Sequence, residues 1–388
     1  MEYSSHDFDV IVVGAGIMGS STAYQLAKRG QKTLLLEQFD FLHHRGSSHG
    51  ESRTVRATYP EDHYCDMVME SSQSWEQAQS EIGYKVYFKA QQFDMGPSDN
   101  KSLLAVISSC EKKSLPYQVL HGQQVADRFS GRITVPESWV GVLTEVGGVI
   151  KPTKAVSMFQ ALAFQKGAVL RDNMEVKNIV KDEVRGGVNV VVADGEKFWG
   201  KKCVVTAGAW MSKIKEGHEA KFAIGSDFPT FASYGEPYIY GTPSLEFPGL
   251  IKIAVHGGYP CDPDKRPWGP GISLDSMKEW IEGRFSGLVD HGEPVVTQLC
   301  MYSMTPDGDF VIDFLGGEFG KDVVIGGGFS GHGFKMAPVV GRILADLVLS
   351  GEAEGVELRH YRIQRFQENP KGNVKDYEDQ VNTFPNQK

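Results

Sequence analysis

The sequence has none of the features that mark a membrane-bound or secreted protein. No apolar run reaches the roughly 18 residues that a membrane-spanning helix needs, and the segment from Met1 to Asp9 is polar and acidic, unlike a secretory signal. There are only five cysteines, at positions 65, 110, 203, 261 and 300, and none forms a Cys-x-x-Cys pair. This scarcity argues against a disulfide framework and against a zinc site. We therefore expect an intracellular protein without a membrane partner.

Basic runs are also missing. Lys and Arg number 40 against 49 Asp and Glu, a net charge of −9, so we expect no nucleic-acid partner. Hydrophobic residues at 41% and charged residues at 23% are ordinary values for a globular protein. At about 150 residues per domain, 388 residues predict two domains, one of which can be discontinuous.

Glycine, by contrast, is abundant, and its placement near the start of the chain is informative. The apolar run 9–13 predicts a strand, residues 20–29 a helix and residues 32–37 a second strand parallel to the first. The turn that opens the helix has the spacing Gly-x-Gly-x-x-Gly, with Gly14, Gly16 and Gly19. Such glycines let the backbone approach a pyrophosphate at the helix N-terminus and let helix and strand pack closely. The sequence therefore predicts a dinucleotide-binding unit.

The acidic residue at the end of the second strand restricts the choice of dinucleotide. Glu37 can accept ribose hydroxyls and disfavours a 2′-phosphate, so FAD or NAD fits better than NADP. Further glycine-rich strand ends stand far downstream, at Gly208 and at residues 326–333. A cofactor held by three parts of the chain favours FAD. The residues alone leave an NAD-dependent dehydrogenase open.

The rest of the chain predicts further helices and strands. Helical periodicity covers residues 65–82, 101–113, 151–167 and 338–349, and strands are expected within 169–188, 199–206 and 323–325. The segment from His360 onward is polar, and we expect it to be a surface tail.

Six ordered motifs carry a resemblance to a known family. They run from near residue 8 to near residue 345 and are VIVVGAGIMGSSTAYQLAKRG, GSSHGESRTVR, VVTAGAW, GLIKIAVH, QLCMYSMTPDGDFVID and GGGFSGHGFK. With them the chain resembles the monomeric sarcosine oxidase family of flavoprotein amine oxidases, which includes N-methyltryptophan oxidase and pipecolate oxidase, and it is most similar to the plant members.

The resemblance implies an α/β fold with a discontinuous, Rossmann-like FAD-binding domain and a second, mixed-sheet α+β substrate domain. On this expectation the FAD-binding domain comprises residues 8–84, 147–215 and 306–388. The substrate domain comprises residues 85–146 and 216–305.

The implied reaction is oxidation of a secondary amino acid, such as sarcosine, an N-methyl amino acid or pipecolate, to an imine, with O2 reduced to H2O2. The implied enzyme is a monomer. Peroxide production suits a peroxisome as well as the cytoplasm, although the last four residues, PNQK, lack a signal of the Ser-Lys-Leu type.

Family positions imply a set of cofactor contacts. Cys300 matches the cysteine that carries FAD through a thioether, a bond whose formation needs a thiolate. Arg53 matches an arginine against the flavin ring. The remaining implied contacts, besides the glycine turn and Glu37, are Gly208, Gly331, Gly333 and Phe334.

A second set is implied for catalysis and substrate binding. Lys252 matches a lysine near the flavin that activates O2, where a fixed cation stabilises superoxide. His256 is expected on the same face of a regular strand as Lys252. Arg56 and Lys335 match the pair that binds the substrate carboxylate. Tyr302 and Tyr240 match positions that line the substrate pocket.

Two further features qualify this assignment. After Trp210 the family usually continues through roughly twenty residues with prolines, whereas this chain passes at once from Met211 to the segment Lys215–His218. We interpret this as an internal deletion, and the alternative function is a flavin-binding family member that it has inactivated. The loop histidines His43, His44 and His49 lack a metal-ligand spacing, so we expect no metal.

Overall fold

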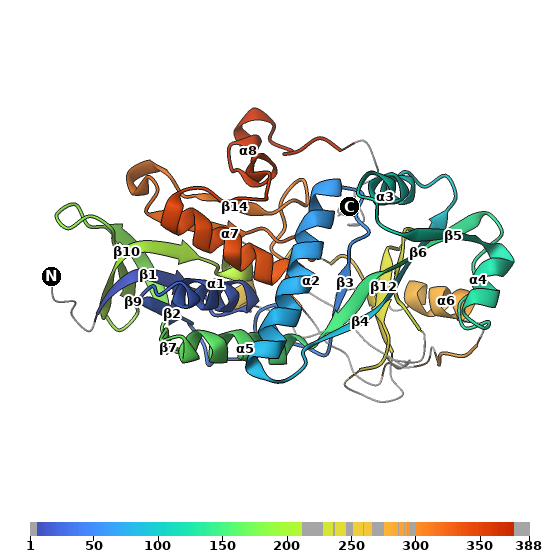
Figure 1. Cartoon of the computed structure of the whole chain (residues 1–388), viewed down its shortest axis with the longest axis horizontal. Coiled ribbons are helices and arrows are strands. Elements are labelled where there is room, and N and C mark those ends of the chain that lie inside the picture. The colour runs from blue at the N-terminus through green and yellow to red at the C-terminus, as the bar shows by residue number, and fades with distance from the viewer. Residues whose placement is uncertain are drawn as a thin grey trace.

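A computed structural model describes residues 6–211, 228–235, 237–245, 251–258, 260–265, 275–285, 287–290, 292, 294 and 300–375. Two β-sheets lie side by side along the molecule, with helix α2 (Asp62–Ile82) between them (Figure 1). Helices α1, α5 and α7 cover the first sheet, and α3, α4 and α6 pack around the second (Figure 1).

The first sheet has eight strands. Its main path runs β14, β15, β10, β1, β2, β7, and β9 and β8 extend it beside β10. The bounds are β1 (Asp7–Val13), β2 (Thr33–Leu36), β7 (Val169–Arg171), β8 (Val176–Lys181), β9 (Val188–Val192), β10 (Lys197–Val205), β14 (Val311–Phe314) and β15 (Val323–Gly327). β1 pairs in parallel with both β2 and β10, and β10 pairs in parallel with β15. The predicted parallel β1–β2 pair is therefore confirmed.

Apolar helix faces bury this sheet. The helices are α1 (Ile17–Lys28), α2, α5 (Pro152–Gln165) and α7 (Ala337–Ser350), and their buried side chains share one core with Val10, Val12 and Leu35. α5 begins at Pro152, whose missing N–H costs nothing in the first turn. α2 ends at Gly83, which is left-handed with φ 88°.

The second sheet has seven strands. Its path is β13, β12, β11, β4, β6, β3, with β5 beside β6. The bounds are β3 (Arg53–Arg56), β4 (Tyr87–Pro97), β5 (Tyr117–His121), β6 (Trp139–Ile150), β11 (Thr230–Ser233), β12 (Ile239–Thr242) and β13 (Lys252–Val255), with α3 (Lys101–Lys112), α4 (Gly122–Arg128) and α6 (Asp275–Arg284). Phe93, Phe231 and Trp280 are central to the core between this sheet, α4 and α6.

One sheet edge joins segments that were expected in different domains. β3, expected in the FAD-binding domain, pairs with β6 of the second sheet, and residues 147–150 belong to the same pairing. We propose the two-domain division with this edge assigned to the substrate domain. The expected deletion after Trp210 falls on residues 212–227, which lie outside the described residues.

The expected surface tail from His360 is wrong in part. Residues 358–375 include η5 (Leu358–Tyr361) and α8 (Arg365–Glu368), and Tyr361 and Arg365 are buried. The polar composition misled the prediction because buried carboxylates elsewhere in the chain satisfy these polar groups.

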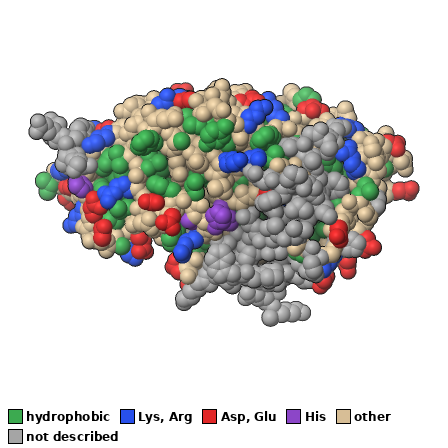
Figure 2. All heavy atoms as spheres, turned by 90° about the horizontal axis from the view of Figure 1, so that it is seen from below, with side chains coloured by type: hydrophobic (Ala, Val, Ile, Leu, Met, Phe, Trp, Pro, Cys, Tyr) green, Lys and Arg blue, Asp and Glu red, His purple; other side chains and the backbone are tan. Residues whose placement is uncertain are grey.

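Surface charge is mixed on the face that Figure 2 shows, where basic and acidic side chains alternate with separate hydrophobic groups. None of the helices within the described residues is long and apolar enough to span a membrane.

Two phenylalanines of α5 provide a matched test of the first core. Phe159 is buried, with its ring 5.8 Å from Tyr24 and 5.2 Å from Trp75, whereas Phe164 on the same helix is 69% exposed. Phe159→Ala should lower the free energy of unfolding by about 3–5 kcal/mol because it leaves a cavity. Phe164→Ala should change it by less than about 0.5 kcal/mol. Urea denaturation of both variants measures the difference, and equal effects would place the core elsewhere.

Candidate functional site

A cavity of about 420 Å³ opens at the carboxyl ends of the parallel strands β1, β2 and β10. In open α/β sheets ligands bind at this end of the strands. Ten residues singled out in the sequence line it, namely Gly14, Gly16, Glu37, Arg53, Gly208, Cys300, Tyr302, Gly331, Gly333 and Phe334. The structure thus brings together residues from three distant parts of the chain.

Close backbone approach explains the glycine turn. Gly14 has φ 96°, and a Cβ there would lie 2.5 Å from the carbonyl oxygen of Thr206 at the end of β10. A Cβ at Gly19 would collide with the carbonyl oxygen of Gly14. The Thr206 hydroxyl donates to the carbonyls of Val13 and Gly14, each at 3.1 Å. Any side chain at these glycines would therefore separate α1 from the two strands.

The N-terminus of α1 faces the same cavity. Its cap residue, Gly16, offers no side-chain hydrogen bond, and the Ile17 N–H donates to the Ser48 hydroxyl at 3.0 Å. Glu37 accepts the Ala15 N–H at 2.9 Å, which fixes its carboxylate beside the glycine turn. The N–H groups at a helix N-terminus suit a phosphate, and a fixed carboxylate suits a ribose. These residues fit the pyrophosphate and ribose of a dinucleotide.

Arg53 and Cys300 meet in the lining of the cavity. The Arg53 guanidinium donates to Cys300 Sγ at 2.9 Å and to the backbone carbonyls of Ser47 and His49 at 3.0 and 2.8 Å. It also lies 5.6 Å from the centre of the Phe334 ring.

Of the predicted aromatic residues, Tyr302 lines the cavity, whereas Tyr240 and His256 contact Tyr302 without lining the cavity themselves. The Tyr240 and Tyr302 hydroxyls are 3.4 Å apart, and the His256 ring lies 5.3 Å from the Tyr302 ring. A Cβ at Gly331, where φ is 78°, would press against both Tyr302 and His256. Burial, reinforced by Arg56 and Lys335, lowers the pKa of His256 to about 4, so its ring is neutral near pH 7.

Lys252 lies at the start of β13, and His256 lies just beyond its end. The Lys252 ammonium donates to the backbone carbonyl of Ser52, the residue before Arg53, at 3.0 Å. Lys252 therefore contacts the segment that carries Arg53, although Lys252 itself does not line the cavity.

Arg56 and Lys335 converge on one tyrosine, Tyr59. Both cations are buried, at 7% and 6% exposure. The Arg56 guanidinium stacks 4.4 Å from the Tyr59 ring, and the Lys335 ammonium donates to the Tyr59 hydroxyl at 2.8 Å. Burial and the Arg56 charge lower the pKa of Lys335 well below its usual range. Arg56 also interacts with the buried carboxyl of Asp94, and two buried cations side by side can hold an anion such as a carboxylate.

Sequence reasoning missed four residues of the site, namely Ser48, Tyr59, Thr206 and His332. Ser48, Thr206 and His332 stand inside quoted motifs, so the motifs marked the segments without assigning these side chains. Tyr59 carries no such signal, because its role depends on a lysine far along the chain. No cluster of three potential metal ligands exists within the described residues, and the loop histidines form none.

Fold and cavity together are typical of a dinucleotide-binding protein, and two buried cations lie near the cavity. Comparisons with known proteins agree. The family described as FAD dependent oxidoreductase matches residues 9–347. Probable sarcosine oxidase of Arabidopsis thaliana is 66% identical over 408 aligned positions, covering 98% of each chain. Peroxisomal sarcosine oxidase of Homo sapiens is 35% identical, covering 92% of this chain and 96% of that protein.

Solved structures show the same fold. L-proline dehydrogenase from P. horikoshii has a TM-score of 0.79 at 23% identity, covering 94% of this chain and 98% of that chain. NikD, described as an unusual amino acid oxidase essential for nikkomycin biosynthesis, has a TM-score of 0.76 at 22% identity, covering 91% and 96%.

The chain belongs to the FAD dependent oxidoreductase family and, within it, to the sarcosine oxidases. It is an FAD-dependent oxidoreductase, as the resemblance predicted, and the NAD-dependent alternative is wrong. The match to the Arabidopsis protein spans 20 more positions than this chain's 388 residues (408 − 388), so that relative has residues that this chain lacks. No comparison favours the inactive alternative.

Two glycines in helices test the close approach at the glycine turn. Gly19→Ala should abolish FAD retention and lower the melting temperature, because its Cβ would collide with the Gly14 backbone. Gly283 in α6 has open space around it, so Gly283→Ala should keep the cofactor and stabilise the helix by up to about 1 kcal/mol. Flavin absorbance per protein and thermal melts measure both effects, and normal flavin content in Gly19→Ala would contradict the account.

Proposed function

We propose that the protein is a flavoprotein oxidase of secondary amino acids such as sarcosine, N-methyl amino acids or pipecolate. The observation that carries this proposal is the buried pair of cations, Arg56 and Lys335, on either side of Tyr59. The names of the sarcosine oxidase relatives support the same substrate class.

The cation pair would bind the substrate carboxylate. Within the described residues the Lys335 ammonium has two acceptors, the Tyr59 hydroxyl and the His332 carbonyl, which leaves one N–H for a ligand. Arg56 donates to the Tyr234 hydroxyl at 3.2 Å and to the Thr58 carbonyl. Positive charge near the substrate nitrogen also favours the neutral amine, which is the form that can be oxidised.

The neutral His256 and the tyrosine pair would orient the amine end against the cavity wall. Burial raises the pKa of Tyr302 well above its usual value, so its hydroxyl remains protonated and can donate or accept a hydrogen bond. His256 at neutral pH offers an uncharged ring in contact with Tyr302. Neither group adds charge that would compete with the carboxylate site.

When bound, FAD supplies the acceptor for a hydride equivalent from the substrate and passes the electrons to O2, giving H2O2. Lys252 would hold a positive charge beside the position where superoxide develops, and a fixed cation in a dry site stabilises such a charge strongly. Its hydrogen bond to the Ser52 carbonyl holds the ammonium at the segment that carries Arg53.

We further propose that Cys300 holds FAD covalently through a thioether at Sγ. The support is the Arg53 guanidinium at 2.9 Å from that sulfur, inside the cavity. We also propose that the enzyme is a monomer. We propose that it acts inside the cell, in the peroxisome or the cytoplasm, and the name of the human relative supports the peroxisome.

Stopped-flow absorbance separates the two half-reactions. In the wild type, sarcosine or pipecolate without oxygen should bleach the flavin, and O2 should restore its colour. Lys335→Met should weaken substrate binding by about 10- to 100-fold, as expected for a lost charged hydrogen bond. Lys252→Met should slow recolouring far more than bleaching.

Lys85→Met, at an exposed position outside the site, is the control and should match the wild type in both phases. If neither amine bleaches the bound flavin, the proposed activity is wrong. If Lys252→Met slows bleaching and recolouring equally, the proposed role of Lys252 in the reaction with O2 is wrong.

Acid precipitation tests the covalent bond. The wild-type pellet should keep the yellow colour, whereas Cys300→Ser should release all of its flavin to the supernatant. Cys261, another half-buried cysteine outside any disulfide, provides the control, and Cys261→Ser should keep a yellow pellet. Release of the flavin from the wild type would show that FAD is bound without a covalent link.

A further inference from the structure

The C-terminal segment, residues 358–375, is anchored to the loop Thr305–Asp309 by a buried ion pair. Arg365 is 6% exposed and donates two hydrogen bonds to Asp307, from Nε to Oδ2 at 2.6 Å and from Nη2 to Oδ1 at 3.1 Å. Its Nη2 also donates to the Asp309 carbonyl at 3.0 Å. Burial alone would raise the pKa of Asp307, but the Arg365 guanidinium holds it below its usual value.

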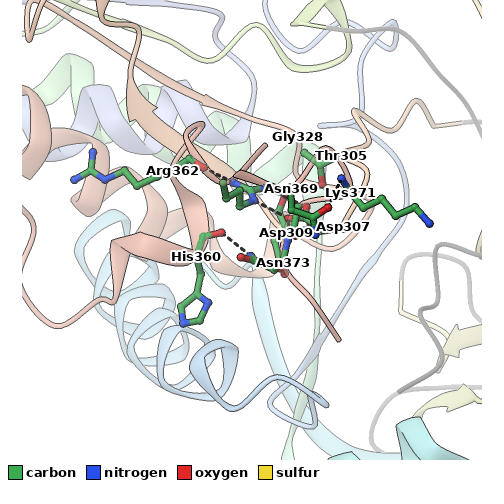
Figure 3. A network of polar contacts seen from close by, with 12 residues as sticks. Thr305, Asp307, Asp309, Gly328, His360, Arg362, Asn369, Lys371 and Asn373 are labelled. Carbon is green, nitrogen blue, oxygen red and sulfur yellow. Dashed lines mark hydrogen bonds and ion pairs between the residues drawn. The ribbon is translucent and has the colours of Figure 1, made fainter. Parts of the chain in front are cut away.

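Asn373 closes a second connection to the same loop. Its backbone N–H donates to Asp307 Oδ2 at 2.9 Å, and its side-chain amide donates to Asp309 Oδ2 at 2.8 Å and to the His360 carbonyl at 3.0 Å. Figure 3 shows Asn373 between the His360 backbone and Asp309. The neighbouring Gly372 has φ 78°, and a Cβ there would collide with the Asp307 carboxylate. The segment is therefore packed onto the loop as closely as its backbone allows.

Gly308, between the two aspartates, connects this loop to the cation pair. Its carbonyl lies 3.0 Å from His332 Nε2, and His332 Nδ1 lies 3.1 Å from the Tyr59 hydroxyl. That hydroxyl accepts the hydrogen bond of the Lys335 ammonium. Contacts thus run without a break from Arg365 to Lys335.

The proton positions along this path follow from its ends. A carbonyl can only accept, so His332 Nε2 carries the hydrogen and Nδ1 accepts. Tyr59 must then donate to Nδ1, which turns its oxygen lone pairs toward Lys335. Burial, followed by the Lys335 charge, lowers the pKa of His332 well below its usual value, so a second proton is excluded. The carbonyl of Gly308 thereby sets the direction of every hydrogen bond up to the ammonium.

A parallel contact supports the same loop. The Thr305 hydroxyl donates to the Asp309 carbonyl at 2.7 Å and lies 3.1 Å from the Ser330 hydroxyl. Ser330 has φ 47°, a strained value for a residue with a side chain, and it precedes Gly331 in the cavity wall. The loop therefore supports both the lysine and the glycine wall of the cavity.

We propose that the C-terminal segment is a clasp that positions the Lys335 ammonium for the substrate carboxylate, acting through the Asp307–Asp309 loop, His332 and Tyr59. This inference rests on the proposed function, because it assigns the clasp to the same carboxylate site. Arg365, Asn373 and His332 are positioning residues, and none of them is expected to touch the substrate.

Acetate is the probe, because it carries the carboxylate of an amino acid without an amine. Its Kd is measured from the shift of the flavin absorbance. Gly372→Ala should push Asp307 away and weaken acetate binding by about tenfold, the effect of a charged hydrogen bond lost by misplacement. Gly355 has a similar φ of 70°, and a Cβ there would lie in open space. Gly355→Ala therefore introduces the same backbone strain without a collision, and it should leave the Kd of acetate within about twofold of the wild-type value.

Substitutions of Arg365 give a second, graded test that does not depend on the Gly372 variant folding. Arg365→Lys keeps the charge and one donor, whereas Arg365→Met keeps neither. Acetate affinity should fall in the order wild type, Arg365→Lys, Arg365→Met. The KM for sarcosine should rise in step while kcat changes by less than about twofold, the signature of lost substrate binding.

Lys335→Met distinguishes a failure of this inference from a failure of the proposed function. If acetate binding is insensitive to Lys335→Met, the carboxylate site itself is wrong. If it depends on Lys335 but not on Gly372→Ala or Arg365→Lys, the clasp has no positioning role and the inference is overturned. A fall in kcat or in flavin content with an unchanged acetate Kd would likewise show a merely structural role.

Discussion

Burial of two positive charges around one tyrosine ring is the constraint on which the substrate side of this protein depends. Arg56 and Lys335 repel each other in a region that water does not reach, an arrangement that destabilises a fold unless its polar neighbours compensate. The compensation comes from the Tyr59 and Tyr234 hydroxyls, from backbone carbonyls and from the buried carboxyl of Asp94, which interacts with Arg56. Helix α2 adds to it, since Ser71 and Trp75 both hydrogen-bond to the Lys335 carbonyl and fix the lysine by its backbone.

The two halves of the site have different physical origins. The dinucleotide side is formed by backbone, where three strand ends and a helix N-terminus approach so closely that glycine is required. The substrate side is formed by side chains from the second sheet and from the segment that follows β15. Arg53 and Arg56 both belong to β3, so this short edge strand places one cation at the sulfur of Cys300 and the other at Tyr59.

The sequence predicted what depends on local pattern. The β1–α1–β2 unit has its own signal, because apolar runs, glycine spacing and an acidic strand end lie within one short stretch. The pairing of β3 with β6 was not predictable, since residues 53–56 carry no cue to their partner strand. The prediction of a surface tail at the C-terminal segment failed for a similar reason. Arg365 looks like a solvated residue until Asp307, distant in the chain, is placed beside it.

The order of strands in the first sheet has a consequence for how the chain is made. β10 lies between β1 and β15, which come from opposite ends of the chain. On the ribosome, the pair β1–β2 is complete early and then exposes an apolar, unpaired edge until β10 emerges. β9 pairs with the first part of β10, but the edge at Cys203–Val205 remains open until β15 emerges. Open edges of this kind invite pairing with other chains. The most hazardous period for this protein is therefore its own synthesis, before the last strand of the sheet exists.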